Sequence, residues 1–280
     1  MPVEPADGGP TNCREWPRFD ATGTSGASGT TLDLVPDPIF NDPRLAVHYD
    51  ELDGRRDDLV HYIAIIDELG ARHILDVGCG TGSFASLLTR AGRSVVGLDP
   101  AHASLSVAQA KPGTEHVRWE LGDVAALAQR EPDLRVDAAT MTGNVAQVFL
   151  TDEQWSSTLR SIEQLLHDDG HLIFETRVPE RRAWESWTRE QTHRHVNLTG
   201  GRTVETWVEL TEVSPPFVSF RHFYRFGEDE HVTSDSSLRF RTLQEINSTL
   251  EQARLALVDV RDAPDRPGLE HVIIARKANQ

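Results

Sequence analysis

Short apolar runs alternate with amphipathic segments along the first two thirds of the chain. The runs are rich in β-branched residues, and the segments between them carry apolar residues at helical spacing. The runs cover residues 73–77, 94–99, 117–123, 136–142 and 170–177. Strands that alternate with helices in this way predict an α/β fold with a doubly wound, mostly parallel sheet.

After Arg182 the apolar positions recur with a period of two. Three such runs lie at residues 203–211, 217–226 and 231–240, separated by Ser214-Pro-Pro and by Gly227-Glu-Asp-Glu. They predict a small antiparallel three-strand insertion within residues 183–241. A helical pattern follows, and residues 255–263 and 269–277 are expected to close the chain as a strand hairpin.

The N-terminal part contains two different kinds of sequence. Residues 1–36 are rich in Gly, Ser, Thr and Pro, and they carry too little apolar surface to offset the entropy of ordering, so we expect a disordered tail. From residue 57 to 69 the apolar positions have helical spacing, and Gly70 suits a helix C-terminus. We therefore expect a lid or helix over residues 37–70 and one folded domain over residues 37–280.

Charge and cysteine content exclude several classes of function. The chain has 28 Lys and Arg against 44 Asp and Glu, a formal net charge of −16, so it repels phosphate backbones and we expect no nucleic-acid partner. Cys13 and Cys79 lie too far apart for a disulfide framework or a metal site. Since no apolar stretch resembles a signal peptide or a membrane span, we expect a cytoplasmic protein without a membrane partner.

Three glycines and two carboxylates follow consecutive strands. Gly78, Gly80 and Gly82 come after the first strand, where glycine permits a tight turn and lets backbone N–H groups approach a ligand. Asp99 ends the second strand, where a carboxylate can accept the hydroxyls of a ribose, and Asp123 ends the third. Together they predict a nucleoside site. Asp123 as a helix N-cap and Asp99 as part of a turn are the structural alternatives.

The charge beside the glycines separates two cofactor classes. Asp76 would repel the pyrophosphate of a dinucleotide, and the glycines are not spaced as in a dinucleotide site. A carboxylate there suits a ligand whose tail carries an ammonium and a sulfonium. This favours S-adenosylmethionine over NAD(P).

These motifs resemble those of a known family. The segments "ILDVGCGTGSFASLL", "VVGLDPAHASLSVAQAK" and "WELGDVAAL" resemble the first three motifs of class I S-adenosylmethionine-dependent methyltransferases, and the resemblance extends over about residues 41–280. It implies a seven-stranded sheet with a reversed last strand, and S-adenosylhomocysteine as product. The insertion is similar to that of the small-molecule branch with glycine and amino-sugar N-methyltransferases. The Asn-Pro-Pro-Tyr motif of nucleic-acid enzymes is replaced by "TGNVAQVF".

Residue by residue, the resemblance implies a set of cofactor contacts. Asp99 would hold the ribose hydroxyls, and Asp123 with the backbone of Val124 would bind the adenine. Tyr49 lies where the family often has a lid and would touch the cofactor tail, with a core tyrosine as the alternative. The methionine tail and the sulfonium would be surrounded by Asp76, Gly78, Gly80, Gly82, Met141, Thr142 and Gly143.

Two residues are candidates for contact with the methyl acceptor. Glu175 ends the fifth strand at the ligand-binding edge and would anchor an amine, unless it forms a surface ion pair with Arg177. His222 in the middle insertion strand would take a proton from a hydroxyl, unless it is a partly buried structural histidine.

The chain is therefore expected to be an enzyme that methylates N or O of a small-molecule substrate, without a metal. An NAD(P)-dependent reductase and a non-catalytic nucleoside-binding protein are the alternatives. The insertion, which has apolar side chains on both faces of one strand, is expected to cover the substrate cavity and to contribute to a homodimer.

Overall fold

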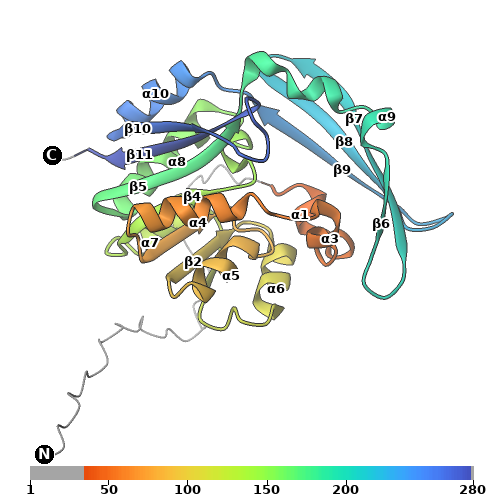
Figure 1. The fold of residues 1–280 in the computed structure, drawn as a ribbon, viewed down its shortest axis with the longest axis horizontal. Helices are drawn as coiled ribbons and strands as arrows, with labels where there is room; N and C mark the ends of the chain where they lie inside the picture. Colours follow the sequence, from red (N-terminus) through yellow and green to blue (C-terminus); the bar gives the residue numbers. More distant parts are fainter. Residues whose placement is uncertain (1–34, 279–280) are drawn as a thin grey trace, which may run out of the picture. The chain divides into compact units, whose positions relative to one another are not determined.

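The computed structural model describes residues 35–278. The predicted disordered tail falls almost wholly on residues 1–34, outside the described residues, and it stays a prediction. The described chain forms two β-sheets (Figure 1). None of its helices has both the length and the apolar character needed to cross a bilayer.

The larger sheet has seven strands in the order β10-β11-β5-β4-β1-β2-β3. β11 pairs antiparallel with β5 and with β10, whereas β1 to β5 pair in parallel. The predicted α/β fold with a reversed last strand is therefore confirmed. The strands are β1 (His73–Val77), β2 (Ser94–Asp99), β3 (Arg118–Leu121), β4 (Val136–Met141), β5 (Leu166–Arg177), β10 (Leu255–Asp262) and β11 (Glu270–Lys277).

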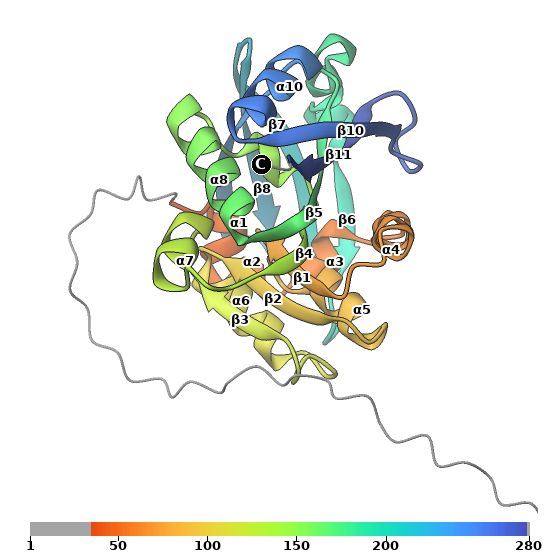
Figure 2. The same ribbon diagram turned by 90° about the vertical axis from the view of Figure 1, so that its left-hand side faces the viewer.

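Helices cover both faces of this sheet. Figure 2 shows α4 and α5 on one side and α7 and α8 on the other. Capping boxes begin two helices, with Thr151 and Gln154 at α8 and with Thr242 and Glu245 at α10. The helices are α4 (Leu59–Glu68), α5 (Ser83–Arg90), α6 (His102–Ala110), α7 (Val124–Arg130), α8 (Asp152–Leu165) and α10 (Leu243–Gln252), and short 3₁₀ turns cover Val145–Gln147, Pro179–Arg181 and Ala183–Ser186.

The fifth strand begins earlier than the sequence pattern predicts. The sequence pattern continues the preceding helix to residue 169, but α8 ends at Leu165 and β5 starts at Leu166, which is fully buried and pairs with Val136 of β4. Asp169, with a φ of 64°, provides the irregular step before the regular pairing resumes. Burial of Leu166 against the sheet thus extends the strand through polar residues.

The insertion contains four antiparallel strands, whereas three were predicted. The additional strand, β6, is four residues long with mostly exposed side chains, so it leaves no alternation in the sequence. Backbone pairing with β7 defines it. The strands, in spatial order, are β6 (Arg194–Asn197), β7 (Thr203–Ser214), β8 (Phe217–Arg225) and β9 (His231–Arg239), and a short helix, α9 (Arg189–Thr192), precedes them.

The segment before α4 packs against this insertion. Its three short helices are α1 (Pro38–Asn41), α2 (Pro43–Ala46) and α3 (Tyr49–Asp53). Ile39, Leu45 and Leu52 from these helices share one buried apolar cluster with Val204 and Tyr224 of the small sheet. The small sheet therefore holds the predicted lid segment in place.

Candidate cofactor and substrate cavity

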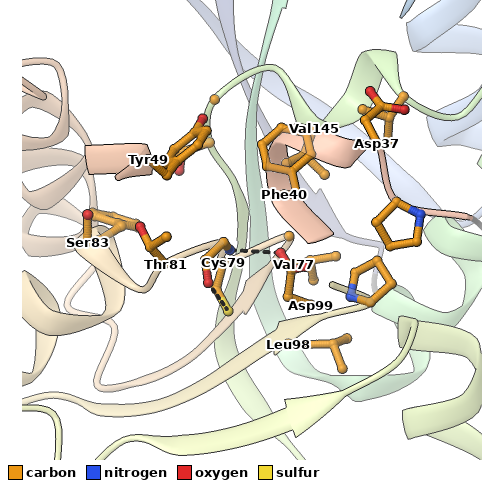
Figure 3. A pocket seen from close by; sticks show the side chains of 18 of the residues that line it. Asp37, Phe40, Tyr49, Val77, Cys79, Thr81, Ser83, Leu98, Asp99 and Val145 are labelled. Atoms are coloured by element: carbon orange, nitrogen blue, oxygen red, sulfur yellow. Dashed lines mark hydrogen bonds between the residues drawn. The ribbon is translucent and has the colours of Figure 1, made fainter. Parts of the chain in front are cut away.

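A cavity of about 830 Å³ opens at the carboxyl ends of β1, β2, β3 and β4 (Figure 3). This volume is typical of small-molecule sites. The predicted cofactor residues that line the cavity are Tyr49, Gly78, Gly80, Asp99, Asp123, Val124, Thr142 and Gly143. The predicted residues that lie outside its lining are Asp76, Gly82, Met141, Glu175 and His222.

The three glycines after β1 face different surroundings. All three have positive φ values, which only glycine adopts without strain. A Cβ on Gly78 would lie 2.6 Å from Val145, and one on Gly82 would lie 2.4 Å from Trp119. A Cβ on Gly80 would meet nothing within 4 Å. Of the three, only Gly80 would point a Cβ into open space, and Gly82 makes room for Trp119 rather than for a ligand.

Asp99 is fixed at the cavity by its own backbone neighbours. Its Oδ2 accepts the N–H of Gly80 at 2.8 Å, and its Oδ1 accepts the N–H of Ala101 at 2.8 Å. Burial raises the pKa of Asp99 above its usual value, and the two hydrogen bonds oppose this shift. Each carboxylate oxygen keeps a lone pair for a further donor such as a ribose hydroxyl.

Asp123 is the N-cap of a helix and also lies at the cavity. Its Oδ1 accepts the N–H of Ala126 at 2.8 Å, which makes it the N-cap of α7. The residue also lines the cavity beside Val124. The N-cap bond fixes the carboxylate, so capping and ligand binding are compatible.

Asp76 and Met141 lie within the sheet rather than at the cavity surface. Asp76 accepts the Thr140 hydroxyl at 2.9 Å, and its second oxygen, Oδ2, is buried without a partner among the described residues. Met141 is fully buried at the end of β4. Neither residue is part of the cavity lining, and their predicted contacts with the cofactor stay predictions.

Burial raises the pKa of Asp76 to about 7, from an ordinary value of 3.8. The folded protein then holds a proton that the unfolded chain releases above its own pKa, so stability is lost as the pH rises through this window. We expect unfolding free energy to fall by about 1 kcal/mol between about pH 5 and 6 from this group. Asp76→Asn should flatten that slope in urea unfolding of the ligand-free protein. An unchanged slope would contradict the assignment.

Glu175 belongs to a buried network behind the cavity. Its carboxylate accepts the Tyr62 hydroxyl and the backbone N–H of Asn144, the latter at 2.8 Å. The Asn144 amide also donates to Glu270 at 3.2 Å. Burial, and then the charge of Glu270, raise the pKa of Glu175. Glu175 thus holds the loop that carries Thr142 and Gly143, which corrects its predicted place beside the acceptor.

His222 lies on the inner face of the small sheet. Its ring packs against Phe220 and Tyr224, with centroids 5.4 Å and 5.9 Å away, and its Nδ1 is buried without a partner among the described residues. Burial and the nearby charge of Arg194 lower the pKa of His222 to about 4. An imidazole with this pKa is a weak base, and it lies outside the cavity lining, which corrects its predicted role.

Several cavity residues come from segments that the sequence interpretation treated as tail or lid. Asp37 and Phe40 enter from α1 and the residue before it (Figure 3), and Asp50 enters from α3. Asp50 pairs with Lys111 at 2.5 Å and accepts the Thr81 hydroxyl at 2.5 Å. The acidic and aromatic residues within "DPIFNDPRLAVHYDEL" were the available signal for these contacts.

The donor and acceptor groups of this cavity fit an adenosine with a cationic tail. Open space borders Gly80 beside the Asp99 carboxylate, and a second carboxylate, Asp123, follows on the next strand. These acceptors match the hydroxyls and the amine of a nucleoside. Of the three cations in the lining, Arg56 and Lys111 are paired with aspartates, and Arg90 donates to the carbonyl of Pro112.

Comparisons with known proteins agree with this geometry. Residues 74–170 match the family described as a methyltransferase domain. A ubiquinone biosynthesis O-methyltransferase from Paracidovorax citrulli is 42% identical over 111 residues, which are 39% of this chain and 44% of that protein. The chain spans less than half the length of the first curated relatives it matches.

Solved structures share the fold at low identity. A sugar N-methyltransferase from a Streptoalloteichus species has 16% identity and a TM-score of 0.67, over 93% of this chain and 100% of that one. An amino pentose methyltransferase from Micromonospora echinaspora, solved with S-adenosylmethionine, has 21% identity and a TM-score of 0.64, over 82% and 94% of the two chains. Residues 74–170 therefore match a methyltransferase domain, and the chain shares its fold with solved methyltransferases, one of them holding S-adenosylmethionine.

Proposed function

We propose that the protein transfers a methyl group from S-adenosylmethionine to an amine nitrogen of a small molecule, and that Asp37 binds this amine. The observation that carries the proposal is the Asp37 carboxylate, at the end of the cavity away from Ser83, which has no cationic partner among residues 35–278 (Figure 3). The sugar N-methyltransferase and the amino pentose methyltransferase with the same fold are consistent with such an acceptor.

Most other charges in the cavity are already neutralised. Asp50 pairs with Lys111 at 2.5 Å, Asp53 lies 3.5 Å from Arg56, and Asp235 pairs with Arg221 at 2.6 Å. Asp99 and Asp123 are assigned to the nucleoside. Within residues 35–278, no ion pair involves Asp37, and Ser236 is its hydrogen-bond partner. Asp37 is therefore the carboxylate available to a cationic acceptor.

The surroundings of Asp37 also suit proton transfer. Burial raises the pKa of Asp37 above its usual value, and the Ser236 hydrogen bond opposes this shift. A carboxylate with a raised pKa attracts an ammonium and accepts a proton from it more readily, which frees the nitrogen lone pair. S-adenosylmethionine supplies, when bound, a methyl group activated by its sulfonium. The walls of the cavity hold the two reactants together, an effect worth about 7–11 kcal/mol when alignment is good.

The insertion closes this end of the cavity through β9. Asp235, Ser236 and Ser237 line it, and the N–H of Ile39 donates to the Ser234 hydroxyl at 3.0 Å, which joins α1 to β9. These contacts support the prediction that the insertion covers the substrate. The homodimer stays a prediction.

Asp37→Asn should lower kcat/KM for an amine acceptor by roughly 10- to 100-fold, since a hydrogen bond to a charged group contributes about 1.5–3 kcal/mol. The measurement is formation of S-adenosylhomocysteine from a panel of amines, with amino sugars included, and from their hydroxyl analogues. Asp235→Asn is the matched control, because Asp235 lines the same end but is paired with Arg221. Equal losses in both variants, or turnover of the hydroxyl analogues alone, would count against an amine bound by Asp37.

The two alternative functions give different results in binding experiments. A reductase would bind NADH rather than S-adenosylmethionine in calorimetry. A non-catalytic nucleoside-binding protein would bind S-adenosylmethionine without turning over any member of the panel. Either result would rule out the proposed methyl transfer.

A further inference from the structure

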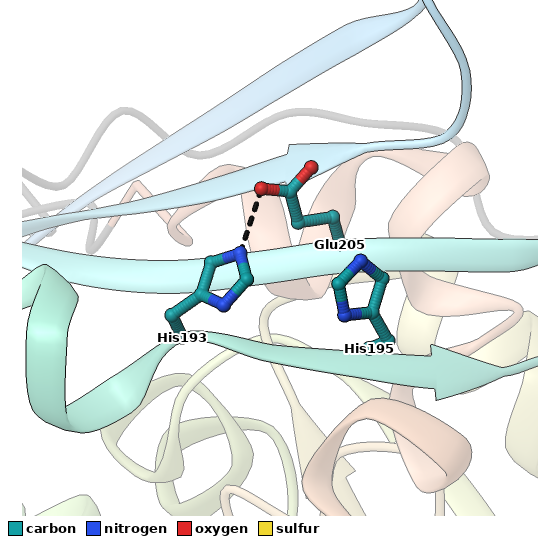
Figure 4. Close-up of side chains that lie close together, drawn as sticks. All are labelled: His193, His195 and Glu205. Atoms are coloured by element: carbon teal, nitrogen blue, oxygen red, sulfur yellow. Dashed lines mark hydrogen bonds and ion pairs between the residues drawn. The ribbon is translucent and has the colours of Figure 1, made fainter.

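The face of the small sheet opposite its apolar cluster carries two histidines close to a buried glutamate (Figure 4). His195 of β6 is directly paired with Glu205 of β7 in the strand register, and His193 lies two residues earlier on the same side. One ligand atom from each of His193, His195 and Glu205 lies within 4.8 Å of the other two. The neighbouring Val204 points to the opposite face, into the apolar cluster with Tyr224.

We propose that His193, His195 and Glu205 bind a divalent transition metal ion of the zinc class, with water completing its coordination. Two imidazoles and one carboxylate form a donor set that zinc accepts in a tetrahedral site with one open position. The Nε2 of His193 and the Oε1 of Glu205 are 2.7 Å apart. Small rotations of the two exposed imidazoles would bring three donors around one ion.

The surroundings of Glu205 resemble an outer coordination shell. Arg225 of β8 pairs with the second oxygen of Glu205, Oε2, which leaves Oε1 directed toward His193. Ligating carboxylates are commonly oriented by such a second bond. Arg189 lies 3.9 Å from the same Oε1 and rests over the ring of Trp207 at 4.4 Å. These two positive charges oppose a cation, so we expect weaker binding than in a closed four-ligand zinc site.

The site would act on the cavity through the residue between the two histidines. Side chains alternate along a strand, so Arg194 points to the inner face, where it donates to the carbonyl of Leu52 in α3. Tyr49, Asp50 and Asp53 of the same helix line the cavity. A metal that joins β6 to β7 would therefore restrain the edge strand that anchors α3.

The test is equilibrium dialysis of the full chain, treated with a chelator, against Zn²⁺ at about pH 7.5, where imidazole is mostly neutral. We expect one Zn²⁺ bound per chain. Affinity should fall at least about tenfold in His193→Gln and in His195→Gln, each of which removes one ligand. His116→Gln, which changes an exposed histidine elsewhere in the chain, is the matched control and should leave binding unchanged. Mg²⁺, which prefers oxygen donors, should not compete.

Two results would overturn the proposal. One is no Zn²⁺ bound by the folded wild-type chain. The other is the same affinity in the His193→Gln, His195→Gln double variant as in the wild type, which would place the ion elsewhere. Circular dichroism of each variant shows that loss of binding is not loss of the fold, since both histidines are exposed. Neither result would affect the proposed methyl transfer.

Discussion

Gly82→Ala is expected to destabilise the protein by about 2–5 kcal/mol, although it adds one methyl group. About 1–2 kcal/mol comes from the left-handed backbone conformation, which disfavours every residue with a Cβ. The rest comes from collision, because the new Cβ would lie 2.4 Å from the Trp119 ring and 3.0 Å from Ala108. The measurement is urea unfolding with and without S-adenosylmethionine. Displacement of the loop after β1 should also weaken cofactor binding.

The chain offers a matched control for the backbone contribution. Gly92 has a φ of 79°, close to the 76° of Gly82, but a Cβ there would meet nothing within 4 Å. Gly92→Ala should therefore show the conformational penalty alone. Trp119→Leu shortens the colliding side chain and should restore part of the stability of Gly82→Ala. Equal destabilisation by Gly82→Ala and Gly92→Ala would show that the contact with Trp119 is unimportant.

The glycine pattern shows how far local sequence predicts a site. The spacing of Gly78, Gly80 and Gly82 predicts a tight turn between strand and helix, which the structure has. It does not predict what each glycine faces. Trp119 comes from β3 and Val145 from the turn after β4, so these neighbours are set by sheet order rather than by spacing. Only the folded chain assigns Gly80 to the cavity and Gly82 to packing.

Strand-end carboxylates were predictable for a related reason. Parallel strands bring their carboxyl ends to one edge, so Asp99 and Asp123 had to lie at that edge once the strands were recognised. The same argument does not apply to Glu175, because Glu175 lies two residues before the end of β5 at Arg177. Its side chain therefore lies within the sheet, on the face that α4 covers with Tyr62. Side chains on both faces of β5 are buried, so the sequence shows no alternation that would reveal which way Glu175 points.

The elements that the sequence did not predict are those with no periodic signal. β6 is short and exposed, and it forms because β7 offers backbone partners. Asp37 stands between the glycine-rich tail and three very short helices, a region where composition indicated disorder up to residue 36. Its place in the cavity depends on the packing of α1 against β9. Long-range contacts of this kind leave no local pattern.

Glu175→Ala should lower the unfolding free energy by about 3–5 kcal/mol. The change leaves the Tyr62 hydroxyl and the Asn144 N–H buried without their acceptor, each at a cost of about 1–3 kcal/mol, and it leaves a cavity as well. Asn144 has a left-handed φ of 62°, so the loop that carries Thr142 and Gly143 depends on this bond. Urea unfolding measures the loss, and calorimetry should show weaker binding of S-adenosylmethionine.

Glu175→Gln separates this structural role from a catalytic one. Glutamine keeps an oxygen for the Asn144 N–H, and its amide can donate to the Tyr62 oxygen, so the fold should be largely preserved. The substitution also removes the repulsion between Glu175 and Glu270, which contributes to the raised pKa of Glu175. If Glu175 only positions the loop, Glu175→Gln will keep most of both stability and kcat/KM. A variant of wild-type stability that has lost most of its activity would instead place the Glu175 charge at the acceptor, and Asp37 would no longer be sufficient.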